Sequence, residues 1–74
     1  MAVPHIKVSH IEIVVRRLPE GIYLATSQDV PGLTVEAETR EEAEKIAPEV
    51  ALDLIESELG RKVSSRPIFS FKFD

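Results

Sequence analysis

The side chains that most often carry nucleophilic, acid–base or metal chemistry are scarce in this chain. It has two histidines, His5 and His10, and no Cys. Neither His has a second His three or four residues away, so the spacing of a metal site is absent. The serines lack the context of a nucleophile elbow, and the three glycines lie too far apart for a phosphate-binding loop. We therefore expect no catalytic residue, no cofactor, no metal ion and no enzyme activity.

Carboxylates are the one abundant reactive group. A metal-dependent nuclease would need several of them to converge from strands and helix, and Glu12, Asp53 and Asp74 are the candidates. However, Glu12 and Asp53 flank apolar residues that must face the core. We expect both to point to water, so a remnant nuclease is a weak third hypothesis.

Acidic residues are concentrated between Glu36 and Glu58. This segment holds nine acids and only two bases, Arg40 and Lys45, which leaves seven net negative charges, while the rest of the chain is net positive by about three. One interpretation is a solvated helix face. The other is an acidic binding surface that attracts a basic partner by electrostatic complementarity. The residues predicted to contact that partner are Glu36, Glu38, Glu41, Glu44 and Asp53.

Composition limits the classes of partner and compartment. A formal charge of −4 disfavours nucleic-acid binding, which depends on Lys and Arg. No apolar run approaches the roughly 18 residues of a membrane span, and the first fifteen residues have no continuous apolar region typical of a signal peptide. We expect a cytoplasmic protein that binds neither nucleic acid nor membrane. Its lack of Cys and its Glu, Lys and Arg content are typical of thermophiles.

Four runs of alternating or β-branched residues predict strands. They lie at 6–17, 22–27, 33–38 and 68–73. In the first run, Ile11, Ile13 and Val15 share one phase, whereas Ile6 and Val8 belong to the other. Either a bulge lies near residues 9–10, or the strand begins there.

Two turns join the first three strands. In residues 18–21, Pro19 presets the turn and Gly21 can take the left-handed position that closes a three-residue loop with a bulge. In residues 29–32, Pro31 precedes Gly32, the order that a type II turn requires. Gly21, Pro31 and Gly32 are therefore predicted structural residues.

The helix has the clearest local signals. Thr39 and Glu42 form a capping box, in which the Thr39 hydroxyl accepts from the Glu42 N–H and the Glu42 carboxylate reaches back to the Thr39 N–H. Gly60 lies where a helix ends. The apolar face comprises Ala43, Ile46, Ala47, Val50, Ala51, Leu54 and Ile55. Pro48 conflicts with this pattern, and we expect one kinked helix with Pro48 toward solvent, or else two shorter helices.

The order β-β-β-α-β predicts a single α+β domain over residues 1–74. An antiparallel meander is followed by a helix that packs on one sheet face and then by a fourth strand, which gives two layers. Phe69, Phe71 and Phe73 share one face of the last strand, and we expect them to be core residues that cover the helix.

The segment 21–32, followed by residues 35–39 and the helix from Glu41 to Ile55, resembles the HicB family of antitoxins. The shared pattern is a Gly-led strand, an acidic and an apolar residue, Pro-Gly, an acidic stretch and a capped helix. The resemblance implies a partial RNase-H-like fold without nuclease carboxylates, and binding to HicA, a small basic RNA-cleaving toxin. A typical HicB continues into a DNA-binding domain, whereas this chain stops at Asp74. The helix also contains Pro48, a feature that resembles small stand-alone relatives more than established antitoxins. We therefore expect no operator binding.

Two functional hypotheses follow. The first is a non-catalytic interaction module that neutralises a small basic toxin-like protein. The second is a stand-alone homodimer, because the first two strands carry apolar residues in both phases, including Val14 and Leu24. One of these faces must remain outside a two-layer fold, and a second copy would bury it.

Overall fold

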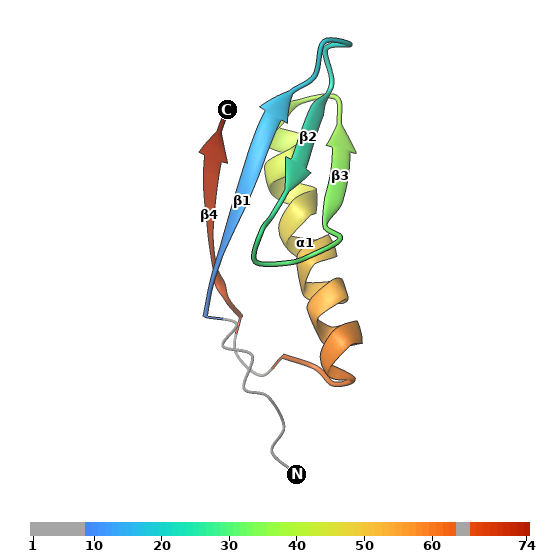
Figure 1. Cartoon of the computed structure of the whole chain (residues 1–74), viewed down its shortest axis with the longest axis vertical. Coiled ribbons are helices and arrows are strands. Elements are labelled where there is room, and N and C mark those ends of the chain that lie inside the picture. The colour runs from blue at the N-terminus through green and yellow to red at the C-terminus, as the bar shows by residue number, and fades with distance from the viewer. Residues whose placement is uncertain (1–8, 64–65) are drawn as a thin grey trace.

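The computed structural model describes residues 9–63 and 66–74, and within them it contains four strands and one helix (Figure 1). In chain order these are β1 (His10–Arg17), β2 (Tyr23–Thr26), β3 (Thr34–Ala37), α1 (Arg40–Leu59) and β4 (Ile68–Phe73). The predicted order β-β-β-α-β is confirmed. β1 begins at His10, and the expected extension through Ile6 and Val8, like His5, lies outside the described residues.

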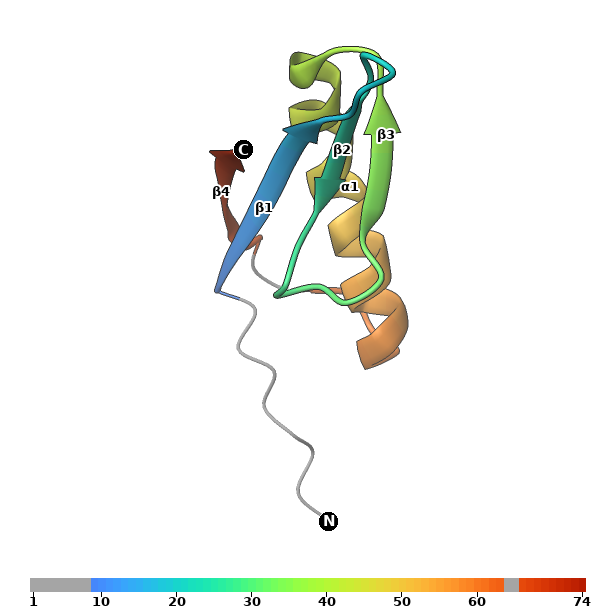
Figure 2. The same cartoon turned by 45° about the horizontal axis from the view of Figure 1, so that its top comes forward.

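The strands form one mixed sheet in the order β3-β2-β1-β4. β1–β2 and β2–β3 are antiparallel and make the predicted meander, whereas β4 pairs with β1 in parallel. The helix covers one side of the sheet, here called the inner face, and the other side is the open face (Figures 1 and 2). This is the expected two-layer α+β fold.

Both turns use a left-handed glycine. Gly21 has φ of 91°, and the Gly21 N–H donates to the Leu18 carbonyl at 2.9 Å while the Leu18 N–H donates to the Ile22 carbonyl at 2.8 Å. In the second turn the Leu33 N–H donates to the Val30 carbonyl at 3.1 Å, with Gly32 at φ of 89°. Pro31 and Gly32 therefore occupy the two central positions of a type II turn.

The helix begins and ends where its capping residues predict. Thr39 is extended, and its Oγ1 accepts from the Glu42 N–H at 3.1 Å. Of the two hydrogen bonds expected of the capping box, this one is formed; the return bond from the Thr39 N–H to the Glu42 carboxylate is absent among the described residues. At the other end Gly60 has φ of 70°, and its N–H donates to the Glu56 carbonyl at 2.9 Å.

The prediction for Pro48 is half right. α1 is one helix and not two, as expected, but Pro48 is buried in it, so the expectation that it faces solvent is wrong. Pro48 precedes Ala51 by three residues and Ile55 by seven, so the three lie along one side of the helix. The ring is apolar, and its burial with Ala51 and Ile55 removes apolar surface from water.

The core lies between the inner face and α1. It is built from aliphatic side chains of the three meander strands, the turn before β3 and the helix: Ile11, Ile13, Val15, Ala25, Val30, Leu33, Val35, Ala37, Ala43, Ala47, Ala51 and Ile55. No polar or charged side chain is buried in the part of the chain that the structure describes. In that same part, no helix has the length and apolarity needed to cross a membrane.

The expectation that all three tail phenylalanines are core residues is only partly met. Phe69 and Phe71 are half-buried against the core, but Phe73 is 45% exposed. The reason is the position of the helix, which packs on β3, β2 and β1. β4 lies beyond β1 at the margin of the sheet, away from α1 in both views (Figures 1 and 2).

Candidate functional site

Three regions of the surface bring polar or aromatic side chains together. They are a pocket on the open face, a shallow pocket at the start of α1, and the outer margin of β4. Each combines residues from elements that are distant in the sequence.

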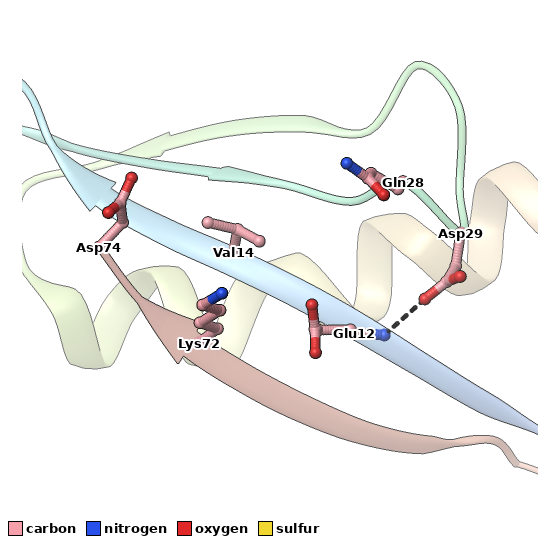
Figure 3. Close-up of a pocket in the computed structure, with 6 residues that line it drawn as sticks. All are labelled: Glu12, Val14, Gln28, Asp29, Lys72 and Asp74. Carbon is pink, nitrogen blue, oxygen red and sulfur yellow. Dashed lines mark hydrogen bonds between the residues drawn. The ribbon is translucent and has the colours of Figure 1, made fainter.

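The open-face pocket lies across β1, β4 and the loop after β2 (Figure 3). Its lining residues are Glu12, Val14, Gln28, Asp29, Lys72 and Asp74. The Arg16 guanidinium lies 3.6 Å from the Asp74 carboxylate, and both side chains are more than half exposed. Lys72 and Arg16 thus offset the acids locally, and such exposed pairs contribute little stability.

Asp29 has a structural role in this pocket, because its carboxylate binds the main chain of β1. The Glu12 N–H donates to Asp29 Oδ2 at 2.8 Å, as the dashed line in Figure 3 shows. The Ser27 hydroxyl donates to the Glu12 carbonyl at 2.6 Å and also accepts from the Asp29 N–H at 3.1 Å. β2 ends at Thr26, so the two side chains satisfy the main chain of Glu12 where a paired strand would otherwise continue. The acidic residue before Val30-Pro31-Gly32 is the sequence signal for this role, which was not predicted.

The three carboxylates of the nuclease hypothesis do not converge. Glu12 and Asp74 line the open-face pocket, whereas Asp53 is on α1, which covers the other side of the sheet. Glu12 and Asp53 are exposed, as predicted. Within residues 9–63 and 66–74, no three His, Asp or Glu side chains are grouped as metal ligands.

The five acids predicted to contact a partner fall into separate places. Glu36 is exposed on the open face of β3, because its register partner Leu24 belongs to that face. Asp53 is exposed on α1, and Glu44, nine residues earlier, is half-buried about half a turn away on the helix. The set therefore forms no single patch.

Glu38 and Glu41 are brought together at the start of α1. They line a shallow pocket with Arg17, Gly21, Tyr23, Thr39 and Arg40. Two arginines share this pocket with the two acids, so its local charge is mixed. Arg40 is also stacked over Phe73, with its guanidinium carbon 4.7 Å from the ring centroid.

A second group of acids lies along the outside of the helix, with the exposed Lys45 between its first two members. Glu42, Glu49 and Asp53 are exposed, and their spacings of seven and four residues place them on one side of α1, opposite the buried alanines. We call these three residues the acidic helix face. Glu49 is paired with Arg66 at 3.4 Å, and the last turn of α1 contains no basic residue.

The margin of β4 is the feature that the sequence analysis missed. Phe73 and Ile68 are the exposed large apolar side chains of the described residues, at 45% and 68%, and both belong to this strand. Arg40 and Arg66 lie over the rings of Phe73 and Phe69. Alternation of the three phenylalanines was visible in the sequence, but the distance between β4 and the helix was not.

Comparisons with known proteins give no assignment. No family model matches the chain, and neither the curated proteins nor the solved structures contain a significant match.

Proposed function

We propose that this protein is a non-catalytic protein-interaction module that binds a small basic protein through the acidic helix face. The HicB-like pattern of residues 21–55 supports a basic RNA-cleaving toxin of the HicA type as the class of partner. The observation that carries the proposal is the row of exposed carboxylates Glu42, Glu49 and Asp53 along one side of α1. Such a row attracts a basic surface before contact and orients it.

The test is inhibition of RNA cleavage by a purified HicA-type toxin encoded beside the gene. Equimolar protein should abolish cleavage, and the dissociation constant should rise steeply with salt. Absence of inhibition at a tenfold molar excess would contradict the proposal.

Charge reversal at two places separates a specific surface from net charge. The double variant E49K/D53K should weaken toxin binding at least tenfold. The matched control E36K/E38K makes the same charge change on and after β3, and it should weaken binding less than threefold. Equal losses in the two variants would show that only the overall charge matters.

A second candidate function is self-association into a homodimer. It is supported by the margin of β4, which has no partner strand in residues 9–63 and 66–74, and by Val14 and Leu24, which are half-buried on the open face. Light scattering at micromolar concentration tests it, and a molecular mass of one chain at all concentrations would contradict it.

A further inference from the structure

The outer margin of β4 presents main-chain groups without a partner strand among the described residues. The Ile68 N–H donates to the Ser9 carbonyl at 3.0 Å, and the Asp74 N–H donates to the Val15 carbonyl at 3.0 Å. In a parallel ladder, alternate residues bond to the same neighbour. The even-numbered residues of β4 therefore face β1, and the N–H and C=O groups of Phe69, Phe71 and Phe73 point away from the sheet.

The same three residues have incompletely covered side chains. They lie on the inner face, because Ile11, Ile13 and Val15 are their register partners. The helix lies over β1 to β3 and leaves Phe73 45% exposed. Apolar side chains and unpaired main-chain groups thus coincide along one edge, which is the combination that favours strand addition.

The opposite edge of the sheet is protected. β3 has four residues, whereas β4 has six. Pro31 precedes β3, Glu36 adds charge within it, and Glu38 adds charge directly after it. Short edges with charges and a nearby Pro discourage pairing. β4 has one charged residue, Lys72, and no Pro. Only one of the two edges is therefore suited to a new strand.

We propose that a second copy of this chain pairs with β4 in antiparallel orientation, with the twofold axis at Phe71. The proposal rests on the self-association offered above as the second candidate function. In this register Phe71 faces Phe71 of the second copy, and Phe69 faces its Phe73. All three outward-pointing residues then form hydrogen-bonded pairs, and the uncovered aromatic side chains meet across the axis.

Charge selects the register of this pairing, and closure favours a second copy over an unrelated strand. In the register centred at Phe71, Lys72 faces the uncharged Ser70, whereas centring at Lys72 would place two lysines opposite each other, which is destabilising. A twofold pairing also uses the β4 edge of both copies at once and leaves only the protected β3 edges outside. Assembly therefore stops at two chains.

Single cysteines test the register, because the chain contains no Cys of its own. Residues directly opposite in a hydrogen-bonded pair have Cα atoms about 5.5 Å apart, within disulfide range. Under mild oxidation F71C should therefore form a covalent dimer. S70C and K72C are each diagonal to themselves, at about 7–8 Å, and should cross-link at least tenfold more slowly. Faster cross-linking of S70C or K72C than of F71C would overturn the register.

A second variant keeps the proposal testable if Phe71 cannot be replaced without loss of folding. Phe73 is the most exposed of the three rings, so F73D should fold, as judged by its circular dichroism, and should raise the dimer dissociation constant at least tenfold. F73L is the matched control and should stay dimeric. A dimeric F73D would place the interface elsewhere and leave self-association itself intact. A monomeric wild-type protein would reject both.

Discussion

The Asp29 carboxylate accepts the hydrogen bond that the Glu12 N–H would otherwise donate to a main-chain carbonyl of a neighbouring strand. Its Oδ2 accepts from the Glu12 N–H at 2.8 Å, beyond the last paired residue of β2. A typical intramolecular hydrogen bond contributes a net free energy of about 0.5–1.5 kcal/mol to stability, and a bond to an ionised acceptor contributes more. Loss of the Asp29 acceptor removes this contribution. The acidic residue of the turn motif is therefore explained by strand termination, without any appeal to binding.

Asp29→Ala should lower the free energy of unfolding by about 1–2 kcal/mol, because the Glu12 N–H loses its acceptor. Asp29→Asn retains a carbonyl oxygen and should cost less. Gln28→Ala is the control, since Gln28 is exposed in the same loop and should change stability by less than about 0.5 kcal/mol. Urea denaturation of the three variants measures the order, and equal midpoints for Asp29→Ala and Gln28→Ala would contradict it.

Thr39 caps the helix through the hydrogen bond from the Glu42 N–H at 3.1 Å. Thr39→Ala removes this acceptor and should lower the free energy of unfolding by about 1 kcal/mol, while Thr39→Ser should cost little. Because α1 is one of only two layers, we expect a shift of the whole chemical-denaturation transition and not local fraying. An unchanged midpoint for Thr39→Ala would mean that the cap contributes nothing.

At the level of elements, three alanines let the helix lie close to the sheet. Ala43, Ala47 and Ala51 are completely buried. Larger side chains at these positions would push α1 away from Ile11, Ile13 and Val15, because close-packed interiors have no room for added methyl groups.

Ala47→Leu should therefore lower the free energy of unfolding by about 1–3 kcal/mol through overpacking. Lys45→Leu is the control, because it also introduces Leu into α1 but at an exposed position. It should leave the free energy of unfolding almost unchanged. Thermal unfolding followed by circular dichroism distinguishes the two. A neutral Ala47→Leu would indicate that helix and sheet can separate freely.

Local signals predicted the elements well, and tertiary position was harder to predict. Helix caps and turns depend on residues that are close in the chain. The predictions for the Thr39 N-cap, the Gly21 and Gly32 turns and the Gly60 terminus are confirmed. Pro48 was misplaced, because the side of a helix that meets the sheet is set by packing and not by the preference of one residue.

The candidate site was predicted less well than the fold. Acidic residues were recognised as a group, but the sequence does not show that Glu36, Glu44 and Asp53 point in different directions once strand and helix are assembled. The β4 margin was missed for a related reason. Whether Phe73 is covered depends on where α1 lies across the sheet, and no local pattern encodes that placement.

At the level of the whole molecule, the one helix of the described residues covers three of their four strands. The layer is complete over the meander and incomplete over β4. A chain of this size buries only about 60% of the surface that its unfolded form exposes, so an uncovered aromatic margin is a considerable loss of core. The molecule therefore consists of a meander that the helix covers well and a fourth strand that pairs fully with β1 but is poorly covered by the helix.

The parallel pairing of β1 with β4 also has a consequence for the order of folding. The two hairpins connect neighbours in the chain, whereas His10 and Ser70, which share a hydrogen bond, are 60 positions apart. Contacts between distant segments carry the largest loop-closure entropy and form late. We expect the meander and helix to make up the transition state and β4 to dock after it. Phe69→Ala should then accelerate unfolding with little change in the folding rate, while Val35→Ala in β3 should slow folding, and stopped-flow chevron plots that show the reverse would refute this order.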